Sequence, residues 1–178
     1  MTEVEKMYER IKAICEGKYF DFSKIETIDC FSGEYEFLSN FYPCEITMPD
    51  GIVYPTSEHA FQAQKTQDID KRRNIATLST PGQAKRAGRK LELRKDWEDI
   101  KNDVMFTTIL YKFQNPELKG KLLATQGKML VEGNTWHDNY WGNCTCDRCK
   151  NIKGENHLGQ SLMGLRIFLL LLEDMCSD

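Results

Sequence analysis

Several features that mark other protein classes are missing from this sequence of 178 residues. Its longest apolar run near the C-terminus, IFLLLL, is far shorter than the roughly 20 residues needed to cross a bilayer, and we interpret it as part of a buried helix. The N-terminal segment MTEVEKMYERIKAIC lacks the basic start and apolar stretch of a secretory signal. No repeat or low-complexity linker is visible. We therefore expect a globular, cytoplasmic protein with no membrane partner.

The sequence also has little excess charge of either sign. Its 24 Lys and Arg residues against 27 Asp and Glu residues give a formal net charge of −3. A chain so nearly neutral has no general attraction for nucleic acid or anionic lipid. Any phosphate must therefore be bound by a local basic patch.

Disulfide pairing cannot account for all seven cysteines, because the number is odd. Four of them are scattered, which favours reduced thiols in a cytosolic protein. The other three, Cys144, Cys146 and Cys149, are close in sequence, and Cys-x-x-Cys is a standard spacing for zinc, which takes four tetrahedral N or S ligands. They form a possible structural zinc site with His137 or His157 as fourth ligand. The alternative is a set of reduced cysteines in a loop.

Apolar periodicity and turn signals predict one helix-rich α+β domain over residues 1–178. Residues 1–17 show helical spacing, and residues 27–53 show the aromatic and β-branched residues of short strands, with Pro49-Asp50-Gly51 as a hairpin turn. Residues 143–155 belong to a long cysteine-bearing loop. Further helices are predicted after Thr56 or Ser57, after Ser79 or Thr80, from a capping-box-like start at Asp96 and Asp99, after Asn115, and from His157 onward.

Two acids stand out in this pattern. Glu58 follows a cap residue and shares a helical face with Phe61, Gln62 and Lys65, but a solvated acid at a helix start is common because the helix dipole favours it. The neighbouring His59 does not complete a zinc-protease motif, which needs two histidines one turn apart. Asp138 lies in the aromatic loop NTWHDNYWGN, where a turn-forming role is the ordinary alternative.

Other residues suit a nucleotide. Asn40, Phe41 and Tyr42 combine an amide with aromatics that can stack on a flat base, although core packing in a strand is equally open. A basic run extends from Lys85 to Lys95 and can bind phosphate, although most such runs are solvated faces.

The order of these segments is familiar. FLSNFYPCEITMPDGIVYPTSEHAFQAQK, LRKDWEDIKNDVM, KFQNPELKGKLLATQGKMLVEGNTWHDNYWG and NHLGQSLMGLR closely resemble the NADAR superfamily, the YbiA-like N-glycosidases. We place the family core at residues 27–166, with residues 1–17 outside it. The stretch NCTCDRCKNIKGE departs from a family loop that is often glycine-rich, so its role is not inherited.

The resemblance implies hydrolysis of a ribosyl C–N bond. Members act on phosphorylated ribosylamino-pyrimidine intermediates of riboflavin biosynthesis or remove ADP-ribose from guanine in nucleic acid, so the expected substrate is a nucleotide or an ADP-ribosylated base, free or within DNA or RNA. Motif position places the family's essential acid on Glu58, its tryptophan on Trp97 and its loop aspartate on Asp138. Paired carboxylates suit an oxocarbenium-like transition state, with the two roles unassigned. The expected binding residues are Asn40, Phe41, Tyr42, Gln62, Lys65, Arg94, Lys112, Trp141, Gly142, Asn156 and Arg166.

This mechanism requires no cofactor, and a structural zinc ion would brace the loop that carries Asp138 and Trp141. Two alternatives come from other classes: a non-catalytic module that binds ADP-ribose or a modified nucleotide, and a zinc-organised protein that interacts with nucleic acid. The sequence leaves the oligomeric state open.

Overall fold

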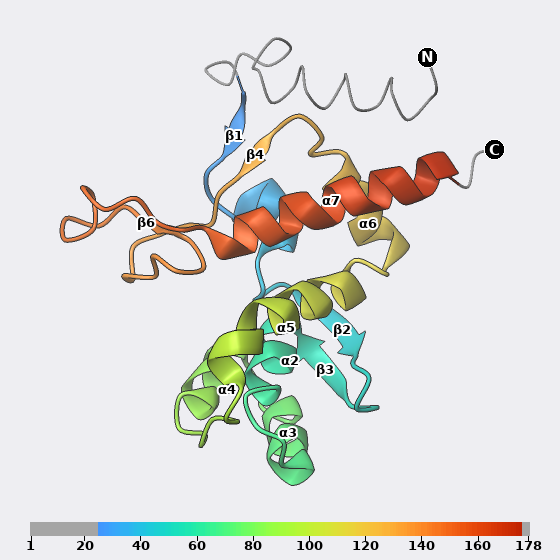
Figure 1. Ribbon diagram of the computed structural model, residues 1–178, viewed down its shortest axis with the longest axis vertical. Helices are drawn as coiled ribbons and strands as arrows, with labels where there is room; N and C mark the ends of the chain where they lie inside the picture. Colours follow the sequence, from blue (N-terminus) through green and yellow to red (C-terminus); the bar gives the residue numbers. More distant parts are fainter. Residues whose placement is uncertain (1–24, 176–178) are drawn as a thin grey trace.

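The computed structural model describes residues 25–175, so the helix predicted over residues 1–17 lies outside the described part. The described chain consists of short β-strands and mostly short helices (Figure 1). In order they are β1 (Thr27–Ile28), the 3₁₀ helix η2 (Gly33–Leu38), β2 (Pro43–Thr47), β3 (Val53–Thr56), α2 (Ser57–Ala63), α3 (Ile69–Ala76), α4 (Pro81–Gly88), α5 (Trp97–Lys112), α6 (Pro116–Leu123), β4 (Met129–Leu130), β5 (Gly133–Asn134), β6 (Asn143–Cys144) and α7 (His157–Met175).

The predicted hairpin is confirmed. Strands β2 and β3 pair antiparallel, and in the turn between them Gly51 N–H donates to the Met48 carbonyl at 2.9 Å. Gly51 has φ +76°, a conformation that favours glycine. Two other pairs, β1 with β4 and β5 with β6, are parallel and only two residues long per strand, and the first of them joins segments far apart in the sequence.

Local capping chemistry explains the helix starts. Thr56 Oγ1 accepts from the N–H of His59 at the start of α2, and Thr80 Oγ1 accepts from Gln83 N–H at the start of α4. The capping box predicted at Asp96 is wrong, because its carboxylate pairs with Arg94 at 2.7 Å and caps nothing. The strands predicted before residue 40 are also largely wrong, because residues 33–38 form η2.

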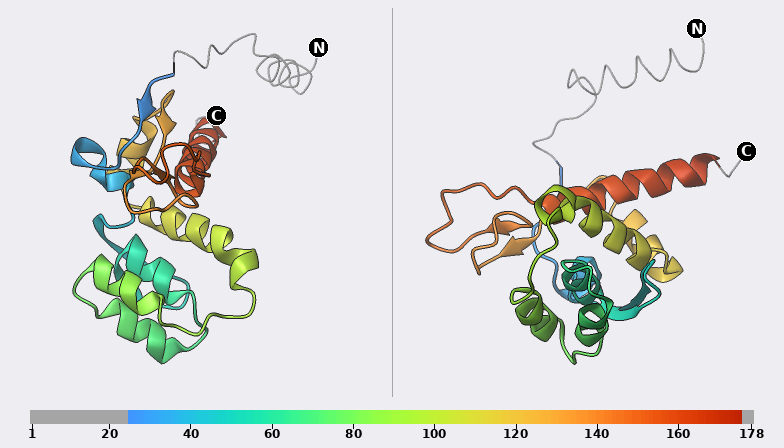
Figure 2. Two further views of the ribbon diagram at one scale, coloured as in Figure 1. Left: turned by 90° about the vertical axis from the view of Figure 1, so that its left-hand side faces the viewer. Right: turned by 60° about the horizontal axis from the view of Figure 1, so that its bottom comes forward.

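The buried apolar residues form two clusters, and α2 contributes to both. The first cluster joins β1, η2, β4, α5, α6 and α7 and includes Phe61 of α2. The second joins the hairpin, α3 and α4 and includes Ala60 and Ala63 on the other sides of α2. Figure 1 and the left view of Figure 2 show this division, with α6 and α7 on one side of α5 and with α2, α3, α4 and the hairpin on the other. Helix α2 is therefore held firmly from two directions.

The C-terminal helix α7 is less buried than its IFLLLL run predicts. Leu165 and Leu169 are buried, whereas Ile167, Phe168 and Leu171 are exposed. Within the described part of the chain, no helix combines the length and the apolar character that spanning a membrane requires.

Candidate active site

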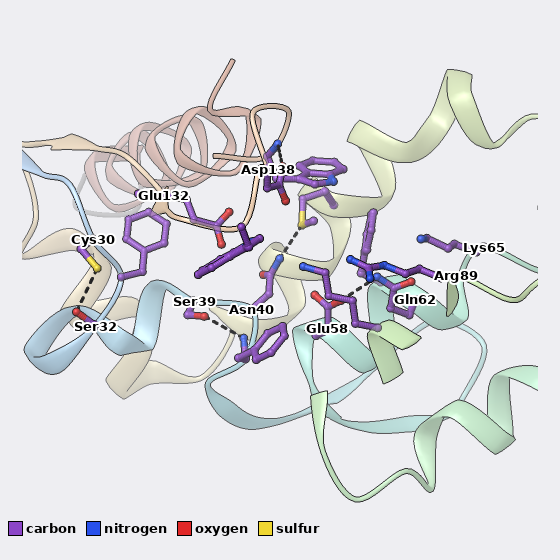
Figure 3. Close-up of a pocket in the computed structure, with 18 residues that line it drawn as sticks. Cys30, Ser32, Ser39, Asn40, Glu58, Gln62, Lys65, Arg89, Glu132 and Asp138 are labelled. Carbon is purple, nitrogen blue, oxygen red and sulfur yellow. Dashed lines mark hydrogen bonds between the residues drawn. The ribbon is translucent and has the colours of Figure 1, made fainter. Parts of the chain in front are cut away.

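A cavity of about 760 Å³ lies between α2, α4, α5 and the loops that follow β1, η2 and β5. Its volume is in the range typical of small-molecule sites. Figure 3 shows acidic, basic and aromatic side chains converging on it from segments far apart in the sequence. Its walls are formed by Cys30, Phe31, Ser32, Ser39, Asn40, Phe41, Glu58, Phe61, Gln62, Lys65, Lys85, Arg89, Met105, Glu132, Gly133, Trp136, Asp138 and Trp141.

Glu58 lies in the first turn of α2 and is buried, with 5% of its surface exposed. Its N–H donates to the Asn40 carbonyl at 2.9 Å, and Gln62 Nε2 donates to its Oε1 at 2.8 Å. Burial raises the pKa of this carboxyl, and the nearby Asp138 raises it further, while Lys85, Lys65 and the Gln62 hydrogen bond oppose the rise. Glu58 is thus a desolvated acid with a fixed orientation.

His59 faces the other way, as the helical spacing predicts. Its Nδ1 lies 2.8 Å from Thr56 Oγ1 and its Nε2 lies 3.0 Å from the Leu78 carbonyl. Both ring nitrogens are engaged in packing α2 against its neighbours, and His59 does not line the cavity.

Asp138 reaches the cavity from the loop between β5 and β6. Its Oδ1 accepts from Trp141 N–H at 2.9 Å. The buried Asn134 holds the same segment, because its Oδ1 accepts from Asp138 N–H and its Nδ2 donates to the Asp138 carbonyl. The structure therefore brings the two acids selected from the sequence, Glu58 and Asp138, into one cavity.

A third acid, Glu132, also lines the cavity and was not among the predicted site residues. Burial raises its pKa to about 7, and the charges of Asp138 and Glu58 act in the same direction. Its backbone N–H donates to Asn156 Oδ1 at 3.0 Å. The only sequence signal was the position of this acid, directly after the three apolar residues 129–131.

Three cations face these acids. Lys65 at the end of α2, Lys85 on α4 and Arg89 at the end of α4 line the cavity. In Figure 3, Lys65 and Arg89 lie on one side of Glu58, and Glu132 lies on the other. Burial lowers the pKa of Lys65, and Glu58 partly opposes this effect. The cavity thus has a cationic end and an acidic end.

Aromatic rings form much of the remaining wall, including Phe41, Phe61, Trp136 and Trp141. Trp97 does not reach the surface of the cavity. It is buried behind Phe61, with ring centroids 5.2 Å apart, and Phe61 in turn meets Trp141 edge to face at 5.3 Å. Trp97 therefore positions the wall and does not form it.

Asn40 lines the cavity and has an unpaired polar atom. Its Nδ2 lies 3.3 Å from the sulfur of Met105, a weak acceptor, and its buried Oδ1 has no hydrogen-bond partner among the described residues. Buried polar atoms are normally paired, so this amide is available to a ligand.

Three cations among the expected binding residues, Arg94, Lys112 and Arg166, lie outside the cavity. Arg94 forms a bidentate pair with Asp96 outside the cavity. Lys112 is buried and donates from Nζ to the Ser39 carbonyl at 2.7 Å, so it supports the turn before Asn40. Arg166 is buried and donates to Thr125 and to the Lys128 carbonyl. These three predictions are corrected, because each cation is engaged outside the cavity, Arg94 by a carboxylate and Lys112 and Arg166 mainly by backbone carbonyls.

Tyr42, Gly142 and Asn156 also stay outside the cavity. Tyr42 packs against the first core cluster. Gly142 approaches the backbone of Glu132 so closely that a side chain would collide with it, and Asn156 bonds the backbone of Glu132 and Leu130. Gly142 and Asn156 thus shape the segment that carries Glu132.

The cysteines predicted as metal ligands do come together. Cys144, Cys146 and Cys149 gather with His137, and their ligand atoms all lie within 4.8 Å of one another. The other histidine considered, His157, instead lies 2.7 Å from the Glu155 carboxylate and stacks on Tyr140.

Comparisons with known proteins identify similar chains and a similar structure. The family model described as the NADAR domain matches residues 28–170. The N-glycosidase YbiA of Shigella boydii is 45% identical over 138 residues, which cover 76% of this chain and 82% of that protein. The chloroplastic riboflavin biosynthesis protein PYRR of Zea mays is 37% identical over 149 residues, which cover 74% of this chain and 23% of the plant protein. The NMR structure of the E. coli protein YbiA matches with a TM-score of 0.71 and 41% identity, covering 84% of this chain and 88% of that one. The structural match confirms the predicted helix-rich α+β fold.

Proposed function

The chain belongs to the NADAR domain family, and from that premise we propose that its cavity hydrolyses a ribosyl C–N bond in a phosphorylated nucleotide. The curated relatives named N-glycosidases support a hydrolase acting on N-glycosyl bonds. The observation that carries the proposal is the meeting of three carboxylates, three cations and an aromatic wall in one cavity. The carboxylates suit the reacting ribose of such a substrate, the cations suit its phosphate, and the aromatic wall suits its flat base.

The acids supply the chemistry. Cleavage of the C–N bond leaves positive charge on the ribose and requires a proton on the departing base, so one acid must be neutral and another ionised. Glu132, with a pKa raised to about 7, is suited to donate that proton. Glu58 and Asp138 then stabilise the cation and activate the attacking water. The charge of Asp138 contributes to the raised pKa of both Glu58 and Glu132, and the charge of Glu58 contributes to that of Glu132, which favours retention of a proton on Glu132.

The remaining walls bind the substrate. Lys65, Lys85 and Arg89 hold the phosphate at the cationic end, where guanidinium and ammonium donors form charge-assisted hydrogen bonds. Phe41 and Trp141 contact the face of the base, and the amide of Asn40 pairs with its edge. Trp97 acts through Phe61 and is a positioning residue.

For the substrate we propose a phosphorylated ribosylamino-pyrimidine. The relative named as a riboflavin biosynthesis protein supports this choice, as does a single cationic end suited to one phosphate. ADP-ribosylated guanine and NAD present the same ribose, phosphate and base and are the alternative substrates to be compared.

The test is to incubate the purified chain with each of these three substrates and to measure free base and reducing ribose phosphate. Turnover should be highest with the ribosylamino-pyrimidine. The variant Glu58→Gln should lose about 10²–10⁴-fold in kcat, because its amide cannot act as a carboxylate. Glu45, an exposed acid of β2, provides the matched control Glu45→Gln, which should keep wild-type activity.

Two results would contradict the proposal. Full turnover by Glu58→Gln would show that Glu58 has no catalytic role. Tight binding of all three substrates without release of base would instead identify a non-catalytic binding module.

A further inference from the structure

The cysteine-bearing loop contains a cluster that the glycosidase chemistry does not use. His137 Nδ1 lies 3.2 Å from Cys146 Sγ and 3.5 Å from Cys149 Sγ. Cys144 completes the group, in which all four ligand atoms lie within 4.8 Å of one another. Cys144 and Cys149 are buried, with 1% and 7% of their surfaces exposed.

These separations fit ligands that share one ion. Zn–S bonds of about 2.3 Å and Zn–N bonds of about 2.0–2.1 Å place the corners of a tetrahedron about 3.5–3.8 Å apart. A disulfide would need sulfur atoms about 2.05 Å apart, and all five cysteines of the described chain are free. Three sulfur ligands and one imidazole are a standard donor set for a structural zinc site.

The backbone is shaped to present the four groups. Cys149 N–H and Lys150 N–H both donate to the Cys146 carbonyl at 2.9 Å, which forms a tight turn between two of the ligands. His137 has φ +69°, an uncommon conformation for a residue with a side chain. That conformation directs its N–H to Cys144 Sγ at 3.3 Å. Such strain persists only where the surroundings compensate for it, and a bond to a metal is a suitable compensation.

The cluster is also joined to the cavity. His137 directly precedes Asp138, and Cys144 N–H donates at 2.8 Å to the side chain of Asn139, the residue after Asp138. On the N-terminal side of Asp138, apolar packing does little to hold this loop, since Trp136 is 59% exposed. Ligands before and after Asp138 would therefore fix its position.

We propose that His137, Cys144, Cys146 and Cys149 bind one zinc ion, and that this ion holds the Asp138 loop in its active position. The first half concerns metal binding alone. The second half rests on the proposed glycosidase function.

The first test measures the metal directly in the purified full chain. We expect one zinc ion per chain, and after exchange with Co²⁺ the sulfur-to-cobalt charge-transfer and strong visible bands of a tetrahedral thiolate site. Cys146→Ser should weaken Zn²⁺ binding by more than the 10–100-fold that loss of an outer-shell partner typically costs. Cys44→Ser, which removes a thiol of β2 far from the cluster, should bind Zn²⁺ as the wild type does. A folded wild-type chain that takes up no Zn²⁺ or Co²⁺, or equal affinity in Cys146→Ser, would overturn the site.

The second test follows the loop with and without the metal. Chelation should lower turnover and expose the peptide bonds after Arg148 and Lys150 to trypsin, and added Zn²⁺ should reverse both changes. The protease readout does not depend on activity, so it remains informative if no substrate is hydrolysed. Unchanged cleavage and turnover after complete removal of the metal would leave the zinc site standing and overturn its role in positioning Asp138.

Discussion

Among single residues, Glu132 has the most direct consequence for pH dependence. Its pKa is raised to about 7 by burial and by the charges of Asp138 and Glu58. A proton donor is active only in its protonated form, which for Glu132 predominates below about pH 7. The side chain is therefore neutral at a pH where an exposed glutamate would be fully ionised.

We expect kcat to fall as the pH rises through about 7, because Glu132 then loses the proton that the departing base requires. Glu132→Gln should lower kcat by about 10²–10⁴-fold and remove this alkaline limb. The measurement is a pH profile of kcat over roughly pH 5–9 for the wild type, Glu132→Gln and the exposed control Glu45→Gln. An unchanged alkaline limb in Glu132→Gln would assign the titration to another group.

At the level of elements, the packing of α4 on α2 controls the orientation of Glu58. Gly88, the last residue of α4, is buried against Gln62, and a Cβ there would lie 2.7 Å from Gln62 Cδ. Gln62 is the residue that donates to Glu58 Oε1. The absence of a side chain at position 88 thus permits the contact that orients the acid.

Gly88→Ala should therefore displace the Gln62 side chain. We expect the free energy of unfolding to fall by about 1–3 kcal/mol from overpacking, and kcat to fall by about 10–100-fold because a small misplacement of a reacting group is costly. Gly120 on α6 has open space where a Cβ would lie, so Gly120→Ala is the matched control and should be neutral or stabilising. Chemical denaturation and steady-state kinetics measure both effects. If Gly88→Ala is destabilised but keeps the wild-type kcat, the packing of α4 on α2 does not control the orientation of Glu58.

The elements themselves differ in how far sequence could predict them. The starts of α2 and α4 were predictable because Thr56 and Thr80 act on N–H groups three residues away. The hairpin was predictable because its turn also depends on residues that are close in sequence. The parallel pairing of β1 with β4 was not predictable, because each strand has only two residues and the two lie far apart in the sequence.

At the level of the whole molecule, the cavity is a product of long-range packing. Its walls come from five separate stretches between Cys30 and Trp141, together with Met105 of α5. Spacing along the chain alone could not show that Glu58 and Asp138 meet, and their selection depended on the family resemblance. Spacing also could not show which cations face the cavity. Lys85 and Arg89 do, whereas Arg166 is buried against Thr125. The basic run was visible, but only the fold decides which of its residues point inward.

A ligand bound in this cavity bridges segments packed against both apolar clusters, so it should stabilise the whole fold. Ribose 5-phosphate, the sugar product expected from a phosphorylated ribosylamine, is a suitable probe. At about 100 times its Kd it should add about 2.7 kcal/mol to the free energy of unfolding, which corresponds to a rise in Tm of about 5–11 °C for a chain of this size.

The basic run supplies its own control for this experiment. Lys65→Ala with Arg89→Ala removes two cations of the cavity and should abolish most of the shift. Arg86→Ala with Lys90→Ala removes two exposed cations of the same segment, outside the cavity, and should leave the shift intact. The measurement is thermal denaturation of the wild type and the two double variants, with and without ribose 5-phosphate. The two variants lose the same number of positive charges, so net charge alone cannot explain a difference between them. An equal shift in both double variants would show that the phosphate binds elsewhere, whereas a selective loss in the first would locate it at the cationic end, on the Lys65 and Arg89 side of Glu58.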